Sequence, residues 1–140
     1  MSLTFPSPEW VAEFEKQLNA SPEYKASSLT WEAGPLALVG EADPDIGLDE
    51  DLAIWLDLLH GECREAKLVS FEEAEKAPFV IRGTYALWKQ VLRKEIGPVK
   101  ALMQGKLKLQ GSMVTIMRYV KGAEALVECA TKVPTKFLDE

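Results

Sequence analysis

The sequence has few of the residues that catalytic and metal centres most often use. It contains one histidine and two cysteines, Cys63 and Cys129, without a Cys-x-x-Cys pair or the Cys/His spacing of a zinc site. The two cysteines also give no disulfide framework, so both are predicted to be small buried apolar residues. A Gly-rich phosphate turn between a strand and a helix is absent as well. We therefore expect neither a metal nor a cofactor.

Long apolar runs and an excess of basic charge are also missing. No segment approaches the roughly 18 consecutive apolar residues of a spanning helix, so integral membrane association is not expected. The first four residues lack the basic start and apolar run of a secretory leader, which favours a cytoplasmic location. The formal net charge of -6 opposes binding to nucleic acid and to anionic lipid surfaces.

The length and the distribution of charge favour one domain over residues 1–140. A chain of 140 residues buries roughly 68% of its unfolded surface, enough for a core that needs no cross-links. The acidic stretch 41–51 contains Pro44 and Gly47 and lacks the carboxylate spacing of a calcium loop. It is predicted to be a solvated surface loop.

Helix starts are marked by serine or threonine caps. Ser7 precedes Pro8 and Glu9, and an apolar stripe follows it at helical spacing. Similar patterns recur along the chain and predict helices at about 8–18, 22–27, 71–77, 85–96, 98–104, 113–120 and 123–132. The tail after Pro134 is expected to be loose.

Short strands with a turn between them are predicted around Trp31 and at 36–39, and further strands at about 52–59, 62–69, 78–81 and 106–110. His60-Gly61 is a two-residue hairpin turn, which would place Asp57 opposite Arg64 and Trp55 opposite Ala66. Hairpin-linked strands preceded and followed by helices predict an α+β fold. Its sheet is five-stranded and mostly antiparallel, with helices packed on one face.

Three blocks of the sequence, at 54–69, 78–92 and 101–120, resemble the sterol carrier protein 2 (SCP2) sterol-binding domain family. The most specific is GKLKLQGSM at 105–113, which fits the family pattern G-K-L-K-L-x-G-x-M. The likeness runs from about Pro8 to Pro134 and is strongest to small stand-alone bacterial members. The chain departs from the eukaryotic carriers at its end, VPTKFLDE, which is not the peroxisomal Ser-Lys-Leu signal.

The resemblance implies a hydrophobic tunnel between sheet and helices, and a role in lipid binding or lipid transport without catalysis. Its ligand would be a fatty acid, acyl-CoA, phospholipid or sterol. On the elements that flank the family's tunnel, the residues expected to contact the ligand are Leu56, Leu58, Trp88, Leu92, Met103, Met113, Ile116 and Met117. Arg93, Arg118 or Lys121 would meet a charged head group at the tunnel mouth.

Two other interpretations remain open from the residues alone. The methionines and the apolar stripe of the helix around Trp88 can equally be packed core residues. The protein would then be a non-catalytic interaction or accessory module without a ligand. A hydrolase built on His60 and Cys63 is the second alternative. It lacks a third group to orient the pair, which a nucleophile and its base normally require.

Overall fold

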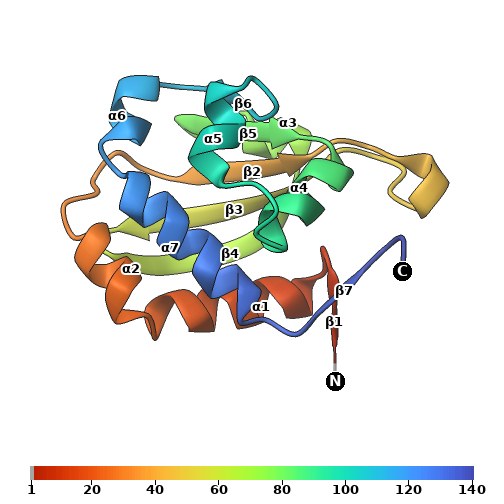
Figure 1. The fold of residues 1–140 in the computed structure, drawn as a ribbon, viewed down its shortest axis with the longest axis horizontal. Helices are drawn as coiled ribbons and strands as arrows, with labels where there is room; N and C mark the ends of the chain where they lie inside the picture. Colours follow the sequence, from red (N-terminus) through yellow and green to blue (C-terminus); the bar gives the residue numbers. More distant parts are fainter. Residues whose placement is uncertain (1) are drawn as a thin grey trace.

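The computed structural model describes residues 2–140, which form two sheets with helices around the larger one (Figure 1). The strands are β1 (Leu3–Phe5), β2 (Leu36–Gly40), β3 (Leu52–Leu59), β4 (Glu62–Ser70), β5 (Phe79–Gly83), β6 (Lys108–Gln110) and β7 (Thr135–Phe137). The helices are α1 (Pro8–Asn19), α2 (Pro22–Ser27), α3 (Phe71–Ala74), α4 (Tyr85–Leu92), α5 (Pro98–Met103), α6 (Met113–Met117) and α7 (Val120–Thr131), with a 3-10 turn η1 (Pro44–Ile46).

The larger sheet has the strand order β4-β3-β2-β5-β6. Its neighbours pair antiparallel except β2 and β5, which are parallel. The parallel pair arises because the chain leaves the β3–β4 hairpin through α3 and returns to the other side of β2. The predicted α+β fold with a five-stranded, mostly antiparallel sheet is confirmed.

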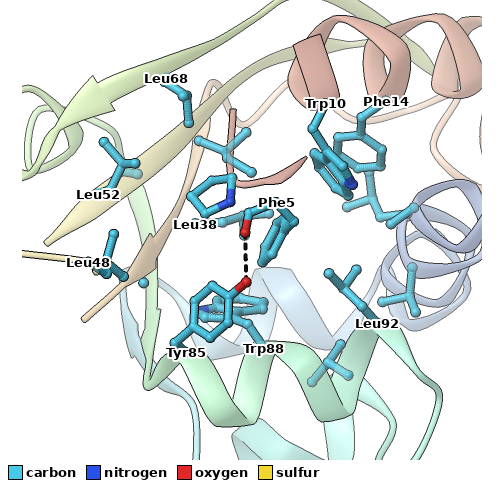
Figure 2. A pocket seen from close by; sticks show the side chains of 18 residues that line it. Phe5, Trp10, Phe14, Leu38, Leu48, Leu52, Leu68, Tyr85, Trp88 and Leu92 are labelled. Carbon is cyan, nitrogen blue, oxygen red and sulfur yellow. Dashed lines mark hydrogen bonds between the residues drawn. The ribbon is translucent and has the colours of Figure 1, made fainter. Parts of the chain in front are cut away.

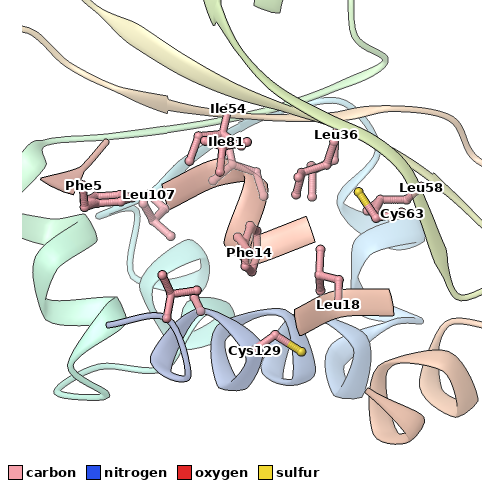
Figure 3. Close-up of a cluster of buried hydrophobic side chains, with 14 of the residues drawn as sticks. Phe5, Phe14, Leu18, Leu36, Ile54, Leu58, Cys63, Ile81, Leu107 and Cys129 are labelled. Atoms are coloured by element: carbon pink, nitrogen blue, oxygen red, sulfur yellow. The ribbon is translucent and has the colours of Figure 1, made fainter. Parts of the chain in front are cut away.

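The two faces of the sheet differ because alternate residues of a strand point to opposite sides. Leu36, Leu56 and Ile81 belong to the main core, which they share with side chains of α1 and α7 (Figure 3). Small residues such as Ala37 and Ala53 point the other way and pack with α3. The large apolar side chains, and the space between them, therefore lie on the face covered by most of the helices.

The predicted helix caps are formed. The side-chain oxygens of Ser7, Ser70, Thr84 and Ser112 each accept a hydrogen bond from the backbone N–H three residues on, at 3.1 to 3.2 Å. Such a bond satisfies one of the amides that the first helical turn leaves free. These local signals explain why the sequence places the starts of α1, α3, α4 and α6 correctly.

The hairpin turn is confirmed, but the predicted register beyond it is wrong. His60 and Gly61 both have positive φ, 49° and 80°, as a type I′ turn requires. A bulge then shifts the register between Asp57 and Leu58, so that Asp57 lies opposite Glu65 and Trp55 opposite Lys67. Arg64 is the extra residue. Its guanidinium still donates to Asp57, at 3.0 Å.

Other boundaries also differ from the prediction, and Trp31, predicted to lie in a short strand, belongs to the loop before β2. α4 ends at Leu92, four residues early, because Lys94 adopts a left-handed φ of 61° and the N–H of Glu95 bonds back to Gln90. The C-terminal tail, expected to be loose, forms β7 and pairs with β1 in parallel. That small sheet joins both ends of the described chain to the helical layer.

Candidate functional site: two apolar cavities beneath the helices

One apolar cavity of about 70 Å³ lies between the sheet, α1, α4 and α7 (Figure 2). Phe5, Trp10 and Phe14 form one side of it, and Tyr85 lies opposite. The Tyr85 hydroxyl donates to the carbonyl of Phe5 at 2.6 Å and accepts from the N–H of Leu138. The Tyr85 hydroxyl thus both donates and accepts a hydrogen bond within the protein, and the apolar ring faces the cavity.

A second apolar cavity of about 90 Å³ lies at the α5–α6 end of the same face. Leu58 and Ile81 belong to its sheet side, while Leu102 and Ile116 come from α5 and α6. Tyr119 also lines it, with its hydroxyl 3.0 Å from Oγ1 of Thr30. Each of the two helices that close this end thus turns one large aliphatic side chain inward.

The two cavities share a wall of four side chains: Leu38 from β2, Trp88 from α4, and Leu126 and Val127 from α7. Trp88 is fixed in this wall because its indole N–H donates to the carbonyl of Val39 at 2.8 Å. The same four side chains therefore separate one cavity from the other.

The chemistry of these cavities is that of a dry hydrocarbon site. Among residues 2–140 no buried side-chain nitrogen or oxygen lacks a hydrogen-bond partner. Burial raises the pKa of the Tyr24 and Tyr85 hydroxyls, so both stay neutral at physiological pH. Apolar cavities of this kind stay free of water, and one of about 150 Å³ holds a benzene molecule. Each cavity alone is smaller than that, so a longer ligand needs both.

The structure divides the predicted ligand-binding residues into three groups. Trp88 lines both cavities, Leu92 lines the first, and Leu58 and Ile116 line the second. Leu56 is fully buried in the core and belongs to neither lining.

The three methionines form the third group, and none of them lines either cavity, although the resemblance implies that they contact the ligand. Met103, Met113 and Met117 are 70%, 39% and 40% exposed. Their helices are short, and because Leu102 and Ile116 occupy the inward positions, the methionines point outward.

Several lining residues were not predicted as part of a site. Trp10 and Phe14 belong to the apolar stripe of α1, and Leu126 and Val127 to that of α7. An apolar stripe looks the same whether it meets another side chain or a cavity. No feature of the sequence distinguishes the two.

The His60 and Cys63 side chains do not form a catalytic pair. His60 lies on the exposed turn, with Nε2 2.6 Å from a carboxylate oxygen of Glu32. The Cys63 thiol is buried and donates to the carbonyl of Glu65. Burial and the nearby Glu15 carboxylate raise the pKa of this thiol to about 12, whereas a nucleophilic cysteine needs a lowered one.

Neither a metal-binding cluster nor a membrane-spanning helix is found among residues 2–140. Within the described part of the chain, no three His, Cys, Asp or Glu side chains are grouped so that they would hold a metal ion. Over the same residues, none of the helices is both long enough and apolar enough to pass through a bilayer.

A sheet whose helix-covered face holds apolar cavities is an architecture suited to small apolar ligands. The sequence profile of the SCP-2 sterol transfer family matches residues 44–123. A crystal structure of sterol carrier protein 2 is 38% identical and superimposes with a TM-score of 0.85 over 91% of this chain and 97% of the other. The chain therefore belongs to the SCP-2 sterol transfer family, a family of carriers.

Other solved structures agree in fold. A conserved hypothetical protein of Thermus thermophilus, named as a possible sterol carrier protein, is 37% identical over 93% of this chain and 90% of its own, with a TM-score of 0.84. The apo form of sterol carrier protein 2 from Yarrowia lipolytica is 15% identical, with a TM-score of 0.55 over 87% of this chain and 89% of its own. The last likeness shows the fold alone. No curated protein matches this sequence.

Proposed function

We propose that this protein is a non-catalytic carrier that holds a fatty acyl chain, as a fatty acid, acyl-CoA or similar lipid. The chain would lie between sheet and helices, in a tunnel formed when the two cavities join past Trp88. The observation that carries the proposal is the shared wall of Leu38, Trp88, Leu126 and Val127 between two dry cavities. Leu92 would contact the ligand on one side of the wall, and Leu58 and Ile116 on the other.

Burial of the acyl chain supplies most of the expected binding energy, and a polar contact at the head group adds to it. Each buried methylene contributes about 0.8 kcal/mol, so a twelve-carbon chain gains roughly 8 to 10 kcal/mol before the costs of binding. Micromolar affinity requires about 8 kcal/mol net. Arg118 and Lys121 flank Tyr119, which lines the second cavity, and they are exposed beside it. They are the groups we expect to meet a carboxylate or phosphate.

Displacement of a fluorescent fatty acid, together with native mass spectrometry of the purified protein, tests this function. The matched variants are Ala123→Phe, which fills the second cavity, and Ala12→Phe, which adds the same ring to an exposed position of α1. Ala123→Phe should weaken binding at least tenfold and Ala12→Phe should leave it unchanged. Thermal unfolding separates lost binding from the destabilisation of roughly 1–3 kcal/mol that overpacking brings.

The small present volumes favour one alternative, an accessory module that carries no ligand. In that case no lipid co-purifies, and no displacement occurs up to high micromolar fatty acid. The same titration therefore decides between the two functions.

A further inference from the structure

The elements α5, β6 and α6 lie together at one end of the molecule (top in Figure 1). They carry most of the exposed large apolar side chains. Among residues 2–140 five large hydrophobic residues are exposed, and four of them are Met103, Met113, Val114 and Met117. Met103 and Val114 are 70% and 67% exposed. Met113 and Met117 are four residues apart and so lie on one side of α6. We call these four residues the methionine surface.

The chain around the methionine surface is basic, although the whole protein is acidic. Between Glu95 and Glu124 there is no Asp or Glu, so all 22 acidic residues lie elsewhere. The same stretch contains five basic residues, all exposed: Lys100, Lys106, Lys108, Arg118 and Lys121.

These five cations are also unpaired. Among the described residues none of them lies within ion-pair distance of a carboxylate, whereas nine of the other eleven lysines and arginines do. The two remaining exceptions are Lys132 and Lys136. The charge of this end is therefore available to an anionic partner.

From this arrangement we propose that the methionine surface and its five cations dock onto an anionic phospholipid bilayer. Long flexible apolar side chains beside lysine and arginine suit the boundary between acyl chains and negative head groups. A second copy of the chain would bring two like-charged surfaces together, which electrostatics disfavours. An acidic protein is the competing occupant, and a surface that served such a partner would not need to bind phospholipid vesicles.

Docking in this way also orients the molecule. The acidic remainder of the chain is repelled by the same bilayer, so the α5–α6 end faces the membrane. Behind it lies the second cavity, to which α5 and α6 contribute Leu102 and Ile116. The docking surface is thus the outer side of the elements that close the cavity, and it goes beyond the carrier function proposed above.

Co-sedimentation with lipid vesicles tests the proposal, using vesicles of phosphatidylglycerol and of phosphatidylcholine. The protein should bind the first and not the second, and it should be released as salt rises from about 0.1 M to about 1 M, where the screening length falls to roughly 3 Å. Lys106→Gln with Lys108→Gln should weaken binding about 30-fold, since each surface cation contributes roughly fivefold. Met113→Gln with Met117→Gln should weaken it about tenfold by removing apolar contact.

The matched control is Lys132→Gln with Lys136→Gln, which removes the two unpaired lysines outside the docking surface and should leave binding unchanged. Failure to bind phosphatidylglycerol vesicles overturns the proposal, as does equal weakening by both lysine pairs. A dimer in sedimentation equilibrium that the methionine variant dissociates also overturns it, because the surface would then serve self-association. Fatty acid displacement in solution is measured separately, so loss of the carrier function and loss of docking are distinguishable.

Discussion

At the scale of single residues, Cys63 shows how burial changes the chemistry of a side chain. Its backbone N–H and C=O are both held by the amide of Asn19, each at 2.9 Å, which fixes the returning strand against the end of α1. The residue is only 3% exposed. The sequence suggests a nucleophile near a histidine, but the surroundings keep this thiol protonated.

The protonated thiol makes stability depend on alkaline pH. Burial raises the pKa of Cys63 from 9.0 to about 12, so between these values the unfolded chain loses a proton that the folded chain keeps. The free energy of unfolding must then fall as pH rises above about 9. Cys63→Ala should reduce the steepness of that fall by up to about 1.4 kcal/mol per pH unit, measured by urea unfolding at several alkaline pH values.

An unchanged slope in Cys63→Ala would show that this thiol already titrates normally in the folded protein. Alkylation provides an independent control. Iodoacetamide should modify Cys63 slowly at neutral pH in native protein and rapidly in urea, because only the thiolate reacts.

At the scale of helices and strands, the structure separates the features that local sequence specifies from those it does not. The caps at Ser7 and Thr84 and the turn at His60-Gly61 were predictable, because each depends on residues within one turn of the chain. The bulge at Arg64 and the left-handed Lys94 were not. The left-handed residue that ends a helix is usually glycine, so a lysine at that position gives no sequence signal for the helix end.

The site was predictable only in part, for a related reason. Periodicity placed Trp88 and Leu92 on one apolar stripe, and both line a cavity. It did not reveal that α5 and α6 turn Leu102 and Ile116 toward the core and leave Met103 and Met113 in solvent. In helices this short, the orientation is set by neighbouring elements.

Trp88 is the side chain on α4 whose replacement should change which ligands fit. Trp88→Leu removes much of the shared wall and the hydrogen bond to Val39, at a cost of about 2–4 kcal/mol in the ligand-free protein. The affinity for palmitate relative to octanoate should rise at least about tenfold, because two more buried methylenes contribute roughly 1.6 kcal/mol. Displacement titrations with both acids measure the ratio.

Trp55→Leu is the matched control, since Trp55 packs with the core on the opposite face of the sheet. This substitution also removes an indole ring, but one that lines neither cavity. The ratio of the affinities for palmitate and octanoate should therefore stay unchanged. A ratio that stays constant in Trp88→Leu as well would mean that the cavities do not join at this wall.

At the scale of the whole molecule, averages conceal how charge is arranged. A net charge of -6 predicts repulsion from anionic lipid, yet the stretch between Glu95 and Glu124 contains basic residues and no acidic ones. Composition gives the sum of the charges and not their positions. The separation of basic from acidic residues gives a basic surface only because the fold places α5, β6 and α6 together at one end (Figure 1).

The pairing of the two ends of the chain is likewise a property of the whole fold. All five strands of the main sheet lie between β1 and β7 in the sequence. Each of these two strands has three residues, too few to give a periodic pattern. Their pairing brings Phe137 against Phe5 and Tyr85, two residues that line the first cavity. The tail therefore packs behind two of the side chains that line the first cavity.

Phe137→Ala should show how much the closed fold depends on this contact. The ring is 6% exposed and lies under the cations of Lys89 and Arg93, so its loss should lower the free energy of unfolding by about 3–5 kcal/mol. Lys136→Ala, at the neighbouring exposed position of β7, should change it by less than about 0.5 kcal/mol. Urea unfolding measures both, and a hydrophobic dye should bind more strongly to Phe137→Ala, because the first cavity loses its support. A cost below about 1 kcal/mol would mean that β7 rests on the surface without closing the cavity.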